Sequence, residues 1–162
     1  MHFVTLGVLV MTAIGASLQL LPVATRLPVG SERWPAAIWW LYTPGVAMTA
    51  LGMGAGATML LAAGAVAVVA ALIAYAALLA RNLTGAKGMP VVVAHGWAAL
   101  GSLVVAIVTA LALACTYVGM PTIDRATAIV LHVVYAAYGF MGMLALGLSY
   151  IVVPMFALST AP

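Results

Sequence analysis

The few charged residues of this chain divide it into apolar runs that are long enough to cross a membrane. The 45 residues from Ala36 to Ala80 carry no formal charge. A helix needs about 20 apolar residues to span the hydrocarbon core, so this run fits two spans better than one. Charged residues make up 4% of the sequence, against about 25% in soluble domains. The sequence therefore predicts an integral membrane protein.

We predict an all-α fold, a polytopic transmembrane helix bundle that forms a single domain over residues 1–162. About five spans are expected, with four as the alternative. The stretch from Gly52 to Gly56 would form the turn that divides the long uncharged run. The expected helices cover residues 2–24, 36–53, 57–80, 91–117 and 126–153.

The positions of the basic residues predict how the helices cross the membrane. Most of them fall in the loops after the first and third helices, namely Arg26, Arg33, Arg81 and Lys87. The positive-inside rule places these loops in the cytoplasm and the N-terminus outside, in a bacterial-type inner membrane. His2 and His132 would then lie near the outer face and His95 near the inner face. If residues 36–80 formed one span plus a re-entrant piece, His95 would share a side with His2.

The composition excludes several classes of function. The net charge of +3 is small and scattered, so nucleic acid is not an expected partner, whereas the lipid bilayer is. Cys115 is the only cysteine, which excludes intrachain disulfides. Glu32 and Asp124 are the only acids, and both lie between apolar runs. No Ser–His–Asp set, phosphate-binding loop or carboxylate pair is present.

Three histidines near the ends of apolar runs are the candidate functional residues. A titratable ring at the edge of lipid costs free energy, and neutral imidazole is a frequent ligand of transition metals and heme iron. His132 lies inside the last helix, with Gly139 on the same face leaving space for a flat macrocycle. His95 opens the fourth helix, where it could bind a metal or cap the helix near the headgroups. For His2, as for the other two, hydrogen bonding without a cofactor is the alternative.

The first and last helices share one spacing of two glycines and a proline. These residues are Gly7, Gly15 and Pro22 in the first helix and Gly139, Gly147 and Pro154 in the last. Glycines allow helices to approach closely, so the match predicts two equivalent packing elements, with chance as the alternative. His2 lies five residues before its glycine and His132 seven. At about 100° per residue, the two rings need not face the same neighbour.

Other side chains carry weaker hypotheses. Gln19 could bond a heme propionate or a quinone, or it could satisfy the carbonyls that Pro22 leaves free. The ten methionines could include a soft metal ligand, although core filling is their usual role. Tyr135 and Tyr138 could form a redox or proton-relay pair beside His132, or anchor the helix at the membrane interface.

Two segments resemble helices of a known family. The patterns His2-Phe-Val-Thr-Leu-Gly7 … Gln19-Leu-Leu-Pro22 and His132 … Tyr138-Gly139-Phe … Val153-Pro154-Met-Phe are similar to helices of heme-copper oxidase subunit I and its NnrS-type relatives. The resemblance covers the first, fourth and fifth helices, about half of the chain. It implies that heme is held by histidines from different helices, for which this chain offers His2, His95 and His132.

The resemblance does not extend to a complete oxygen-reducing centre. There is no adjacent His-His pair, and three histidines cannot supply two hemes and a three-histidine copper site together. Subunits of that family contain more than five helices. This chain would therefore be a fragment, a half, or a protomer that assembles.

The leading hypothesis is an integral membrane b-type heme protein, an electron-transfer protein or a heme-dependent oxidoreductase acting on a small gas. His132 would be one axial ligand, with His2 or, failing that, His95 as the other; a single histidine would leave a site for a gas. A homo-oligomer or a further membrane subunit, and an electron donor, are the expected partners. The alternatives are a heme-free structural or transporter subunit and a copper- or quinone-handling protein. The candidate cofactor or metal contacts are His132, His2, His95, Gly139, Gly7 and Gln19.

Overall fold

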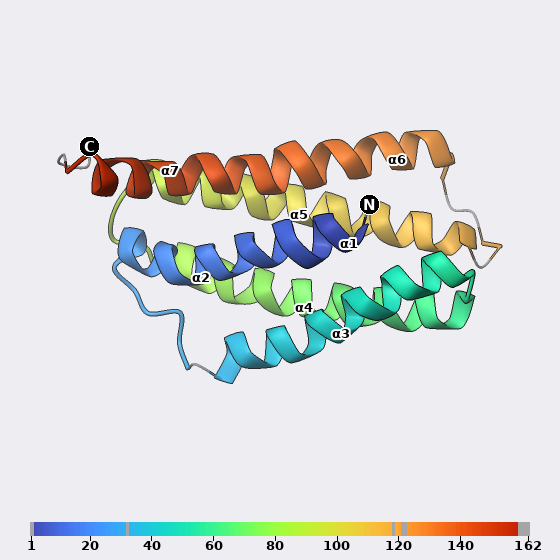
Figure 1. Ribbon diagram of the computed structural model, residues 1–162. Helices are drawn as coiled ribbons and strands as arrows, with labels where there is room; N and C mark the ends of the chain where they lie inside the picture. Colours follow the sequence, from blue (N-terminus) through green and yellow to red (C-terminus); the bar gives the residue numbers. More distant parts are fainter. Residues whose placement is uncertain (1, 32, 118, 121–122, 159–162) are drawn as a thin grey trace.

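The computed structural model describes residues 2–31, 33–117, 119–120 and 123–158. Within these residues the regular structure is helical, and long antiparallel helical runs form an all-α bundle (Figure 1). The first run comprises α1 (His2–Val4), the π-helix η1 (Thr5–Val10) and α2 (Met11–Thr25). The next three are α3 (Arg33–Ala55), α4 (Thr58–Thr84) and α5 (Pro90–Tyr117). The last comprises α6 (Arg125–Val133), the π-helix η2 (Val134–Gly142) and α7 (Met143–Phe156).

Four of these runs are long and apolar enough to cross a membrane. They are His2–Thr25, Thr58–Thr84, Pro90–Tyr117 and Arg125–Phe156. The 23-residue helix α3 is long enough but less apolar, because Trp39, Trp40 and Tyr42 lower the hydropathy of its first half. Each of the five expected segments is helical, with ends at most four residues from those expected. The number of helices in the described residues that meet both criteria is consistent with the lower of the two span counts that the sequence predicts.

The loops after α2 and α4 lie side by side at one end of the bundle. The backbone N–H of Lys87 donates to the carbonyl of Thr25 at 3.1 Å. The connection from α5 to α6 and the turn from α3 to α4 lie at the other end (Figure 1). Most basic residues of the chain therefore gather at the end opposite Arg125.

Close glycine contacts join α3 and α4 into a hairpin. A Cβ atom at Gly52 would collide with the backbone of Leu61, and one at Gly64 with the backbone of Thr49. The hairpin turns at Gly56, whose φ of +65° suits glycine. The turn falls at the end of the glycine-rich stretch that the sequence singled out, because α3 continues to Ala55.

Hydrogen bonds between helices hold the first run in place. The hydroxyls of Ser17 and Tyr75 lie 2.7 Å apart and join α2 to α4. Tyr42 of α3 donates to the carbonyl of Leu6 in η1 at 2.9 Å. Polar groups in an apolar interior need such partners. Together these bonds fix the start of the chain, and with it His2, relative to α3 and α4.

Candidate functional site

His2 and His132 come from opposite ends of the described chain and lie together in the bundle. Their ring centroids are 6.4 Å apart and their planes differ by 23°. Both side chains are half-buried. Helical phase alone leaves open whether the two rings face the same neighbour, and the structure brings them close together and nearly parallel between α1 and α6.

The π-helices explain why uniform helical phase does not describe the histidine-bearing helices. η1 begins three residues after His2, and η2 begins two residues after His132. A π-helix is bonded from i to i+5, so the rotation per residue of an α-helix does not apply across it. Each π-helix also contains the first glycine of the shared spacing, Gly7 or Gly139. Such segments are rare and occur frequently at functional sites.

The ring of His132 is oriented by α5. Its Nδ1 atom lies 3.1 Å from the carbonyl oxygen of Ala106 and 3.5 Å from the hydroxyl of Thr109. A carbonyl oxygen only accepts hydrogen bonds, so Nδ1 carries the proton and donates it to Ala106. In the neutral ring Nε2 then keeps a free lone pair. Histidines that bind metals are commonly oriented in this way by a backbone carbonyl.

A cavity of about 580 Å³ adjoins both rings. Helices from every run line it, mainly with aliphatic side chains such as Val68, Leu72 and Ile107. This volume lies within the range of about 300–1,000 Å³ that is usual for ligand and cofactor sites. The polar side chains that line the cavity are His2, Thr5, Thr49, Tyr117, Arg125 and His132.

His95 lies apart from this pair, in the first part of α5. Its Nδ1 donates to the carbonyl of Val91 at 2.8 Å, and its ring lies 5.8 Å from that of Tyr150. It packs so closely on α7 that a Cβ at Gly147 would lie 2.8 Å from its own Cβ. His95 does not line the cavity. Among the described residues, no group of three or more His, Cys, Asp or Glu side chains could hold a metal ion.

The space at Gly139 is used for helix packing rather than for a macrocycle, which corrects the expectation from the sequence. A Cβ at Gly139 would lie 2.6 Å from that of Ser102, so α5 fills this space. Gly7 has ordinary room, since its Cβ would contact Val46 at 3.7 Å. Gln19 is exposed on α2. None of the three predicted contacts lines the cavity.

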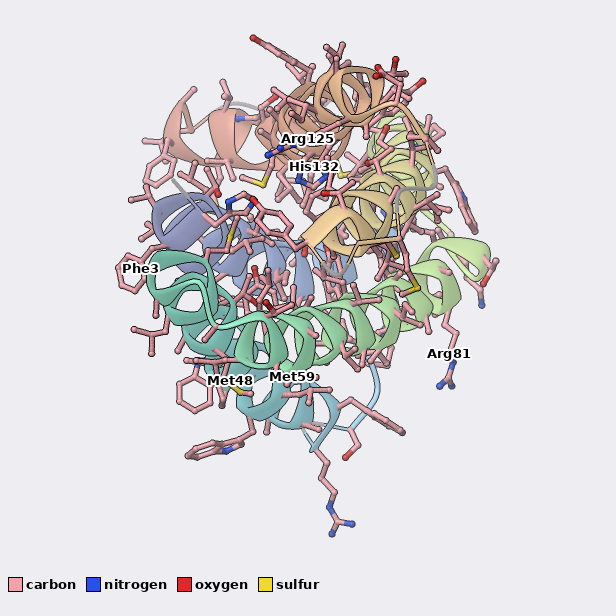
Figure 2. The ribbon with its side chains drawn as sticks, turned by 90° about the vertical axis from the view of Figure 1, so that its right-hand side faces the viewer. Phe3, Met48, Met59, Arg81, Arg125 and His132 are labelled. Atoms are coloured by element: carbon pink, nitrogen blue, oxygen red, sulfur yellow. The ribbon has the colours of Figure 1, made fainter. Side chains whose placement is uncertain are left out.

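Arg125 and Tyr117 are site residues that the sequence prediction missed. Arg125 precedes His132 by seven residues, so the two lie on one face of α6, two turns apart. Figure 2 shows both side chains directed from α6 toward the interior of the bundle. The i, i+7 spacing of Arg125 and His132 is the signal in the sequence that indicates this shared face.

The comparisons with known proteins do not identify a family. No protein-family model matches the chain, and no curated protein or solved structure matches it either. The function is therefore argued from the site alone.

Proposed function

We propose that this is an integral membrane b-type heme protein in which His2 and His132 are the axial ligands of the iron. The observation that carries the proposal is the ring pair beside an apolar cavity. A metal–imidazole bond is about 2.0 Å, so two imidazoles in line on one metal have ring centroids about 6.3 Å apart. The separation of 6.4 Å between the rings of His2 and His132 matches this value, and ligation would require the stacked rings to turn until both Nε2 atoms point at the iron.

The donor set and the cavity suit heme better than a bare metal ion. A porphyrin supplies four nitrogen ligands, which leaves two axial positions for the protein. A bare zinc or copper ion usually takes more than two protein ligands and needs no cavity. The volume of about 580 Å³ and its aliphatic lining provide room for an apolar macrocycle. The Nδ1–H bond from His132 to Ala106 would hold the ring ready for ligation.

Two axial histidines favour electron transfer over gas binding, because both free positions on the iron are taken. The cluster of Arg26, Arg81 and Lys87 at one end of the bundle supports a cytoplasmic position for that end by the positive-inside rule. The N-terminus and the heme would then lie toward the outer face of a bacterial-type inner membrane. An electron donor or acceptor would reach the heme from that side.

The test is an absorbance spectrum of the full chain, expressed with sufficient heme and purified in detergent. We expect a Soret band and, after dithionite reduction, the sharp α and β bands of a six-coordinate low-spin heme. The reduced protein should not bind carbon monoxide. His2→Ala should open one axial position, so the reduced variant should bind carbon monoxide, and His132→Ala should lose most of the heme.

His95→Ala is the matched control, because His95 also donates through Nδ1 to a backbone carbonyl but does not line the cavity. Its spectrum should equal that of the unmodified protein. The absence of a Soret band under heme-replete expression would refute the proposal. Loss of the low-spin spectrum in His95→Ala, with the spectrum of His2→Ala unchanged, would show that His95 rather than His2 is an iron ligand.

One contact favours a second candidate, a heme-free membrane subunit. His132 already bonds across to Ala106 in α5, which is how histidines join helices without a cofactor. In that case His132→Ala would lower stability by about 0.6 kcal/mol, the average for such bonds in a membrane protein. Neither the unmodified protein nor the His132→Ala variant would then contain a chromophore.

A further inference from the structure

Arg125 lines the same cavity as the histidine pair. It stands seven residues before His132 on α6, which corresponds to about 10.5 Å along the helix axis. Figure 2 shows its side chain turned toward the interior of the bundle, whereas Arg81 projects away from it. The guanidinium of Arg125, a cation with several N–H donors, therefore lies at one end of a cavity that is otherwise lined mainly by aliphatic side chains.

The guanidinium of Arg125 is not engaged by a carboxylate of the described residues. Its contact is with the ring of Tyr117, at 6.0 Å from the centroid. The adjacent carboxylate, Asp124, caps α6 by accepting from the backbone N–H of Thr127 at 2.8 Å and from its hydroxyl at 3.0 Å. These bonds lower the pKa of Asp124 below its usual value. The carboxylate of Asp124 thus caps α6 and does not pair with Arg125.

Resting on the proposed function, we infer that Arg125 binds the propionate carboxylates of the heme. Heme b carries both propionates on one edge of an otherwise apolar ring. Arginine presents two parallel N–H groups that match a carboxylate. The heme would then be oriented with its carboxylate edge toward the α5–α6 end, with Tyr117 against the other side of the guanidinium and the apolar edge toward the middle of the bundle.

The test compares heme b with its dimethyl ester, which has the same ring and iron but no carboxylate. Both are titrated into heme-depleted protein in detergent and followed by the Soret band. Hydrogen bonds to charged groups are stronger than neutral ones, so Arg125→Gln should weaken heme binding roughly tenfold or more. Binding of the ester should not change. Arg81→Gln, the same substitution on an exposed arginine outside the cavity, should alter neither affinity.

The outcomes separate this inference from the proposed function. If Arg125→Gln weakens heme and ester equally, or affects neither, Arg125 does not recognise the propionates and the inference is wrong. The same conclusion follows if Arg125 instead holds a lipid phosphate, because the unmodified protein would then not discriminate heme from its ester. In all of these cases a low-spin spectrum that depends on His2 and His132 would still support the heme site. If neither porphyrin binds the unmodified protein, both proposals fail.

Discussion

Ser17 and Tyr75 form a fully buried polar pair between α2 and α4. Ser17 donates its hydroxyl proton to the carbonyl of Ile14 at 2.9 Å. It must therefore accept from Tyr75, whose hydroxyl is the donor across the helices. The two partners are unequal, because Ser17 keeps a second hydrogen bond if Tyr75 is lost, whereas the Tyr75 hydroxyl has no other hydrogen-bond partner among the described residues.

This asymmetry predicts that Ser17→Ala is more harmful than Tyr75→Phe. The serine variant leaves a buried hydroxyl unpaired and should lose about 1–3 kcal/mol of unfolding free energy, against about 0.5–1.5 kcal/mol for the tyrosine variant. Reversible unfolding in mixed detergent, followed by circular dichroism, measures both. The double variant should be more stable than Ser17→Ala alone, and equal effects of the two single substitutions would contradict the assignment of the donor.

At the residue scale, the sequence predicted part of the site. His2 and His132 stood out because titratable rings are rare and costly near lipid. Their pairing and the role of Arg125 depend on which helices become neighbours, which composition does not encode. Gln19 illustrates the same point: the sequence gives its position along α2 but not the direction of its side chain, which is exposed and does not line the cavity.

Among the helices, α5 and the last run illustrate how glycines set the distance between elements. Gly147 faces His95, Gly139 faces Ser102, and His132 faces Ala106, so α5 pairs with the last run along its length. The contacts at Gly139 and Gly147 are too close for a Cβ. The glycines of the last helix thus bring α5 near enough to orient His132.

Gly139→Ala should push η2 away from α5. The added Cβ would meet Ser102, and overpacking of this kind costs about 1–3 kcal/mol. The same unfolding assay should show this loss, and displacement of His132 should also broaden the spectrum of the proposed heme. Gly101→Ala is the control, because no atom lies within 4 Å of its Cβ. Ser102→Gly in the Gly139→Ala background should recover part of the loss; without recovery, the contact with Ser102 is not the cause.

At the element scale, the helices were predictable and their π-helical segments were not. Runs of apolar residues bounded by charges fix where helices lie, because a helix satisfies its own backbone in lipid. The carbonyl of Leu6 in η1 also accepts a hydrogen bond from Tyr42 of α3, and the apolar pattern does not encode such a contact between helices. The spacing of glycines and proline that the first and last helices share includes Gly7 and Gly139, one in each π-helix. It does not indicate that these segments are π-helical.

For the molecule as a whole, the two ends of the bundle differ in charge, and this predicts its orientation. We expect the α5–α6 end to face outward and the basic end to face the cytoplasm. In a Cys115→Ser background, Met120→Cys at the first end should react with a membrane-impermeant maleimide in intact cells. Lys87→Cys at the second end should react only after permeabilisation. The reverse pattern would place the N-terminus and the proposed heme site inside.

The hairpin of α3 and α4 bears on how the chain is integrated while it is being synthesised. Among the long helical runs of the described residues, α3 alone falls short of the apolarity of a membrane span, and it emerges from the ribosome before the more apolar α4. Its glycine contacts with α4 provide close packing of the kind that drives helix association in lipid. We therefore expect that α3 remains at the translocon until α4 has been synthesised. The two helices should then enter the bilayer together as one unit.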